Sequence, residues 1–269
     1  MDITVPTGAI AGLLTEGILV IAIPVILLIV WKKKTKASLK PAVAGMIIFP
    51  LFGILLKAIP GYFLLMADNP VSRVLNSNIW LYSIIGGGLL AGIFEEGGRF
   101  VAFKFFLKKY RSNKDAISYG IGHGGFESAY MGLAAFNYVI LALTVNAAGM
   151  GVLTAGLDEA NTAAVTAQIQ SIAATPFYVP AVLGVVERIS AIVFHISMSV
   201  LDLAAAREKK YLPLFPLAIL LHTLMNSMIG FVLAGMISTI ALECMLAAYS
   251  AVIAFFAYRL YKKPGEINE

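Results

Sequence analysis

Long apolar stretches alternate with short polar segments along the whole chain. A transmembrane helix needs about 20 mainly apolar residues, and seven stretches come close to or exceed that length. They cover residues 8–31, 42–66, 79–104, 116–147, 177–205, 212–230 and 233–258. The fourth is long enough to break near Phe136–Asn137, and a tight turn near Gly235 separates the last two. The pattern predicts seven transmembrane helices.

The composition agrees with a membrane protein. Of the 269 residues, 59% are hydrophobic and 13% are charged, and the mean hydropathy is +0.86. Soluble domains are about 45–50% apolar and about 25% charged. With one cysteine, Cys244, the chain has no intrachain disulfide. We therefore expect an all-α polytopic protein in which residues 1–269 form a single membrane domain around a buried polar cavity.

Basic residues collect in alternate connections between the spans. Sixteen of the 20 Lys and Arg residues follow spans one, three, five and seven. Because cytoplasmic loops carry an excess of Lys and Arg, this predicts an outside N-terminus and a cytoplasmic C-terminus in a prokaryotic cytoplasmic membrane. The lysines gather at span ends, so the net charge of +5 does not indicate a nucleic-acid partner. The expected partners are the lipid bilayer and a substrate.

One outer connection, 148–175, contains Asp158 and Glu159 but neither Lys nor Arg. It is expected to be an extracytoplasmic loop or an amphipathic helix lying on the membrane surface.

Polar residues inside the spans are the candidates for function. A charged side chain near the bilayer centre costs about 2.5–3.5 kcal/mol on insertion scales. Spans three to six nevertheless carry eight chemically active residues, and we expect 79–230 to be the catalytic core. They are Glu95, Glu96, Arg99, His123, Glu127, His195, His222 and Asn226.

Four of these residues lie at one depth. Glu95 and His123 are each nine residues from a basic residue at the end of their spans, which is roughly 14 Å of helix. His195 and His222 are twelve and eleven residues from the same end, roughly 16–18 Å. Convergence on one site is the simplest explanation. Asp202, closer to its span end, is expected to cap the helix or be solvated.

Spacing within the helices supports this convergence. Arg99 can meet Glu95 at i,i+4 or Glu96 at i,i+3, which would leave the other carboxylate free to exchange a proton. His222 and Asn226 also share a helix face at i,i+4. Small residues four apart, such as Gly120 and Gly124, allow close helix packing.

The residue types favour water activation. The chain has neither an HExxH zinc motif nor a GxSxG nucleophile elbow. Glu95 or Glu96 could act as the general base, while His222 and Asn226 donate hydrogen bonds to an oxyanion. This mechanism needs no cofactor. Equally, a carboxylate with His123, His195 and His222 could hold a catalytic zinc ion.

Four motifs together resemble the CAAX-protease and bacteriocin-processing superfamily of membrane proteases, which includes PrsW-like proteins. The motifs are Phe94-Glu-Glu-Gly-Gly-Arg99, Gly122-His-Gly-Gly-Phe-Glu127, Phe194-His195 and His222-Thr-Leu-Met-Asn226. Among its branches the chain is most similar to the YhfC-like proteins. The resemblance implies a helical core with a cavity open to the cytoplasm. It also implies that Glu95 is the base, with histidines and Asn226 positioning water and oxyanion.

We therefore expect an intramembrane endopeptidase of the glutamate-activated-water type, with a zinc metalloprotease as the mechanistic alternative. Its substrates would be membrane proteins or lipidated, for example prenylated, peptides. Buried Glu and His residues also occur in proton relays, so a proton-coupled transporter or channel is the alternative function. A third possibility is a scaffold in which the polar layer serves packing alone.

Overall fold

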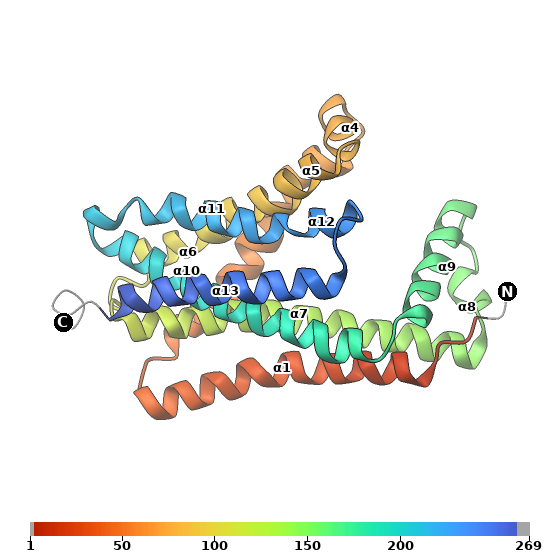
Figure 1. The fold of residues 1–269 in the computed structure, drawn as a ribbon, viewed down its shortest axis with the longest axis horizontal. Coiled ribbons are helices and arrows are strands. Elements are labelled where there is room, and N and C mark those ends of the chain that lie inside the picture. Colours follow the sequence, from red (N-terminus) through yellow and green to blue (C-terminus); the bar gives the residue numbers. More distant parts are fainter. Residues whose placement is uncertain (1–2, 263–269) are drawn as a thin grey trace. The chain divides into compact units, whose positions relative to one another are not determined.

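The computed structural model describes residues 3–262, and every regular element within them is a helix (Figure 1). Seven helical spans are long and apolar enough to cross a membrane. They are Thr7–Thr35, Lys40–Met66, Ile79–Phe106, Asn113–Ala148, Val179–Arg207, Lys209–Leu233 and Thr239–Tyr261. The predicted class, an all-α polytopic membrane protein with seven spans, is confirmed.

Three spans are single or nearly single α-helices: α1 (Thr7–Thr35), α7 (Asn113–Ala148) and α13 (Thr239–Tyr261). The second and third spans alternate between α-helix and the wider π-helix. Their elements are α2 (Lys40–Ile48), η1 (Phe49–Leu56), α3 (Lys57–Gly61), η2 (Tyr62–Met66), α5 (Ile79–Leu81), η3 (Tyr82–Leu89), η4 (Gly92–Glu96), α6 (Gly97–Val101) and η5 (Ala102–Phe106). The fifth and sixth comprise η6 (Val179–Gly184), α10 (Val185–Arg207), η7 (Lys209–Tyr211), α11 (Leu214–Ser227) and α12 (Ile229–Leu233).

Proline or glycine lies within several of the π-helical segments. Pro50 and Pro180 lie at the starts of η1 and η6, where the missing proline N–H interrupts the regular hydrogen-bond ladder. Local 3₁₀ or π adjustments accommodate such interruptions in membrane helices. In the third span, η4 begins at Gly92 and contains Glu95 and Glu96. Single π-turns often mark functional sites.

Two expected boundaries differ in the structure. The proposed break at Phe136–Asn137 is wrong, because α7 runs without interruption from Asn113 to Ala148. Neither residue lacks a backbone N–H, so nothing in this pair interrupts the helical ladder. The turn at Gly235 is present, with a positive φ of 67°. The seventh helix, however, begins at Thr239, after Ser238 caps it by accepting a hydrogen bond from the Ala241 N–H.

The chain divides into two compact units, each with its own apolar core. One contains residues 1–23 and 128–189, and its core includes Val5, Ile10 and Val139. Within it, the segment 148–175 folds into α8 (Gly151–Thr154) and α9 (Glu159–Ala174). Its placement at the membrane surface stays a prediction.

The other unit contains residues 24–127 and 190–269 and holds all eight predicted site residues. It also contains the short helix α4 (Pro70–Asn76) between the second and third spans. Glycines bring its functional helices together. A Cβ at Gly92 would lie 2.7 Å from the Ile219 carbonyl oxygen of α11, and one at Gly120 would lie 2.9 Å from the His195 carbonyl oxygen of α10. The predicted role of glycine in close helix packing is confirmed at these positions.

Candidate functional site

Glu95 lies at the centre of the polar layer. Its Oε2 is 3.2 Å from Nε2 of His123 and 3.8 Å from Nε2 of His222. Its Oε1 is 3.6 Å from Nζ of Lys57, which belongs to the second span. The Glu95 side chain is 6% exposed, whereas that of Lys57 is 32% exposed. Three other spans thus surround one carboxylate.

Glu96 has a different set of partners. Its side chain is fully buried and forms an ion pair with Arg99, which is also fully buried. The other Glu96 oxygen lies 2.5 Å from Nδ1 of His222. Of the two pairings that the spacing allowed, the structure shows the i,i+3 pair of Glu96 with Arg99. Glu95 is the carboxylate left for other contacts.

His195 is held from both sides of its ring. Nη2 of Arg99 lies 2.9 Å from Nδ1, and Oε2 of Glu127 lies 2.6 Å from Nε2. Arginine can only donate hydrogen bonds, so Nδ1 must accept from Arg99. The ring proton is therefore on Nε2, where it is donated to Glu127. Glu127 is only half-buried, at 19% exposure, so this chain of contacts leads outward from the buried layer.

The predicted common depth corresponds to a real cluster. The His195 ring centroid is 4.5 Å from that of His123 and 5.5 Å from that of His222. All three histidines are buried, and they come from α7, α10 and α11. The distances from the span ends predicted this layer because the rise along a helix is nearly constant.

Asn226 lies toward one side of this cluster. Its side-chain amide is 3.5 Å from the carbonyl oxygen of Gly87 in η3, which is a long hydrogen bond. Two turns of helix separate Gly87 from Glu95. The expected role of Asn226 in stabilising an oxyanion stays a prediction.

Two charged residues of the layer were missed in the sequence. Asp202 was expected to cap α10 or be solvated, but it is fully buried beside Glu96 and Arg99. Lys57 of the second span was not among the predicted site residues, yet it contacts Glu95. The position of Lys57 within an apolar span of the sequence was the available signal. Asp202 lies near the end of its helix, and this position suggested a capping or solvated residue although the side chain is buried.

The donor set fits a divalent metal. Glu95, His123 and His195 each offer a ligand atom, and these atoms lie within 4.8 Å of one another. Zinc binds such carboxylate and imidazole groups at about 2.0–2.2 Å. Among the described residues, the layer contains the carboxyl groups of Glu95, Glu96, Glu127 and Asp202 and the cations of Lys57 and Arg99.

The hydrogen-bond partners of each histidine indicate which of them can bind a metal. A metal-binding histidine usually donates its other ring N–H to a carboxylate or carbonyl group. His222 meets this condition, because Nδ1 faces Glu96 and Nε2 faces Glu95. His195 does not, because Arg99 occupies Nδ1 as a donor. His195 lies close to Glu95 and His123, but the donor group of Arg99 at its Nδ1 leaves His222 as the histidine that fits this pattern.

Comparison with known protein families matches residues 19–247 to the family described as YhfC intramembrane metalloprotease. The chain belongs to this family. It is 33% identical over 220 residues to the uncharacterized membrane protein YhfC of Bacillus subtilis strain 168, covering 81% of this chain and 83% of the relative. No solved structure matches the chain.

Family membership agrees with the resemblance carried by the four motifs. It supports an integral membrane protein and, in general, an intramembrane protease. All eight residues of those motifs that we selected lie in the unit formed by residues 24–127 and 190–269.

Proposed function

We propose that the protein is an intramembrane metallopeptidase that hydrolyses peptide bonds of membrane proteins or lipidated peptides. The observation that carries the proposal is the buried cluster in which Glu95 faces both His123 and His222, with Glu127 beside the neighbouring His195. Glu95 is eleven residues from the end of its span at Phe106, or roughly 16 Å of helix. A substrate that reaches this depth would itself be associated with the membrane.

Glu95, His123 and His222 would hold the metal. Glu96 would orient His222 through Nδ1, as outer carboxylates orient many zinc-bound histidines. A bound zinc ion would polarise the scissile carbonyl and make water easier to deprotonate. His195 would be a positioning residue in this arrangement, because Arg99 fixes its tautomer and its Nε2–H holds Glu127.

Glu127 is the best-placed general base. It is the most exposed carboxylate of the layer and keeps one hydrogen bond to His195. It would take a proton from the water whose oxygen bonds to the scissile carbonyl carbon. The same proton would then pass to the nitrogen as the C–N bond breaks. Lys57 and Asn226 are the donors available to the developing oxyanion.

A metal-free mechanism is the alternative for the same reaction. In it Glu95, rather than Glu127, is the base, and His123 and His222 hold the water. The direct contact between His123 Nε2 and Glu95 Oε2 at 3.2 Å favours this version. The two mechanisms differ in the role of Glu95: metal ligand in one, proton acceptor in the other.

Purified protein in liposomes tests the proposal with two measurements. The first is cleavage of a set of single-span and prenylated peptides, and the second is bound zinc by mass spectrometry. We expect Glu127→Gln to abolish cleavage while retaining zinc, and Glu95→Gln to lose both. Glu187→Gln, in the other unit, is the matched control and should change neither.

Other outcomes point elsewhere. Cleavage by metal-free protein that survives chelators but not Glu95→Gln would establish the glutamate-activated mechanism. Solute or proton flux without cleavage would favour the transporter. Unchanged cleavage in both Glu95→Gln and Glu127→Gln would overturn the assignment of this site.

The orientation forms part of the proposal. With the basic connections in the cytoplasm, the N-terminus lies outside and Glu127 and Lys57 are the exposed edge of the layer. The alternation of 16 of the 20 basic residues supports this orientation.

A further inference from the structure

An apolar pocket of about 550 Å³ lies in the unit that also contains the polar layer, and its described lining residues do not belong to that layer. Helices α10, α11 and α13 and the short η7 provide its lining. Ligand pockets commonly have volumes of 300–1,000 Å³. Its lining includes Tyr211, Leu217, Leu221, Tyr249, Val252 and Arg259.

The pocket extends along one half of the membrane. Tyr249 and Arg259, both in its lining, are ten residues apart on α13, which is roughly 15 Å. This is about half of the hydrocarbon core, which is about 30 Å thick. At the opposite end from Arg259, the Tyr249 hydroxyl donates to the Leu221 carbonyl oxygen at 2.9 Å. The dimension matches one acyl chain in one leaflet.

The end of the pocket near the C-terminus of α13 is basic. Arg259 lies near the end of α13, and its guanidinium group stacks on the Phe255 ring at 4.6 Å. No acidic side chain pairs with Arg259 within residues 3–262. Lys210, beside Tyr211, is paired with Glu208 at 3.2 Å and contributes less free charge. Arginine binds phosphate well because its planar donors match the phosphate oxygens.

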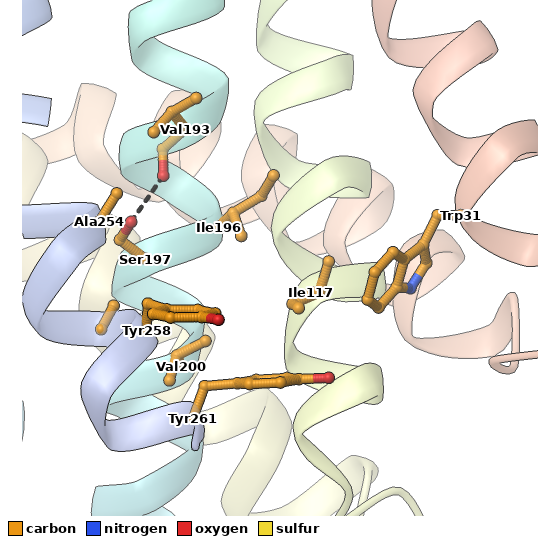
Figure 2. A pocket seen from close by; sticks show the side chains of 10 residues that line it. Trp31, Ile117, Val193, Ile196, Ser197, Val200, Ala254, Tyr258 and Tyr261 are labelled. Atoms are coloured by element: carbon orange, nitrogen blue, oxygen red, sulfur yellow. Dashed lines mark hydrogen bonds between the residues drawn. The ribbon is translucent and has the colours of Figure 1, made fainter. Parts of the chain in front are cut away.

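A second pocket provides an internal comparison. It has a volume of about 410 Å³ and lies on another face of α13, where Ala254 and Tyr258 contribute to its lining (Figure 2). None of the described residues that line it is charged. Figure 2 shows the Ser197 hydroxyl, which donates to the Val193 carbonyl oxygen at 2.8 Å. The second pocket is therefore apolar like the first, but its described lining contains no cation.

We propose that the larger pocket binds one acyl chain of an anionic phospholipid, whose phosphate pairs with Arg259. The length of the pocket, its apolar lining and the position of Arg259 at its basic end together select this occupant. The lipid would hold α11, which carries His222, against α13.

The experiment uses delipidated full-length protein, native mass spectrometry, and phosphatidylglycerol or phosphatidylcholine with identical acyl chains. We expect phosphatidylglycerol to bind more tightly, and Arg259→Gln to weaken its binding about fivefold, as expected for one interfacial cation. Lys262→Gln is the matched charge control: Lys262 is three residues away and outside the pocket lining. It should leave the affinity unchanged.

A pair of filling variants tests the pocket itself. Val252→Trp should abolish phosphatidylglycerol binding, whereas Ala254→Phe, which fills the second pocket on the same helix, should not. Each variant is first checked by size-exclusion chromatography. Equal binding of the two lipids, equal effects of Arg259→Gln and Lys262→Gln, or displacement of phosphatidylglycerol only by a prenylated peptide would overturn the proposal. Binding is measured without substrate, so failure of the peptidase proposal would leave this result intact.

Discussion

Replacing Glu96 with glutamine would change the buried layer at its most enclosed point. Glu96 and Arg99 are both fully buried, so the substitution removes the negative charge that Arg99 contacts. The glutamine can still accept hydrogen bonds, and the Asp202 carboxyl remains beside the guanidinium. Glutamine and glutamate have nearly the same shape, so a change in stability measures the effect of the lost charge.

The expected destabilisation follows from the cost of a buried, poorly compensated charge. Removing one partner of a buried pair typically costs 3–5 kcal/mol. Because the Asp202 carboxyl remains beside Arg99, we expect the destabilisation by Glu96→Gln to be at the lower limit of this range, about 3 kcal/mol. For a chain of this size that corresponds to a decrease in Tm of roughly 6–12 °C. Because Glu96 also orients His222, zinc affinity should fall about 10- to 100-fold.

Thermal unfolding in detergent and zinc competition with a chelator measure the two effects. Glu187→Gln is the control, because the Glu187 side chain pairs with Arg188 but is 28% exposed. Its decrease in Tm should be clearly smaller. A Glu96→Gln protein with the Tm and zinc affinity of the original would refute the assignment of Glu96 as the partner of Arg99 and His222.

Three further predictions follow from the same contacts. Glu127→Gln should lower kcat about 10²- to 10⁴-fold with bound zinc unchanged, as expected for loss of a general base; a parallel loss of zinc would instead make Glu127 a ligand. Gly120→Ala should destabilise the protein by about 1–3 kcal/mol in thermal unfolding, because its Cβ would press on the His195 carbonyl; an unchanged Tm would contradict that close approach. In a Cys244→Ser background, an impermeant thiol reagent should label Ser77→Cys from outside intact cells, and label Ser38→Cys only after permeabilisation. The opposite result would reverse the proposed orientation.

The depth of the site was predictable from the sequence, because each helix converts residue number into distance. Counting from the span ends placed Glu95, His123, His195 and His222 in one layer, and the structure brings them into contact. Seven spans were predictable for a similar reason, since bilayer thickness sets the length of each apolar stretch.

Rotation about the helix axes was not predictable. It determines that Glu96, not Glu95, pairs with Arg99, and the π-helical turn of η4 alters the angular spacing on which i,i+4 reasoning depends. Asp202 was misjudged because its distance from the span end was known while the side it faces was not. The fourth span kept its helix through Phe136–Asn137 because those residues do not interrupt the backbone hydrogen bonds.

The imidazole of His222 has one nitrogen near each of two consecutive glutamates, at 2.5 Å from Glu96 and 3.8 Å from Glu95. Those carboxylates therefore cannot be disturbed independently by anything that shifts α11. A displacement of α11 would therefore change the distances from the His222 ring to both carboxylates together.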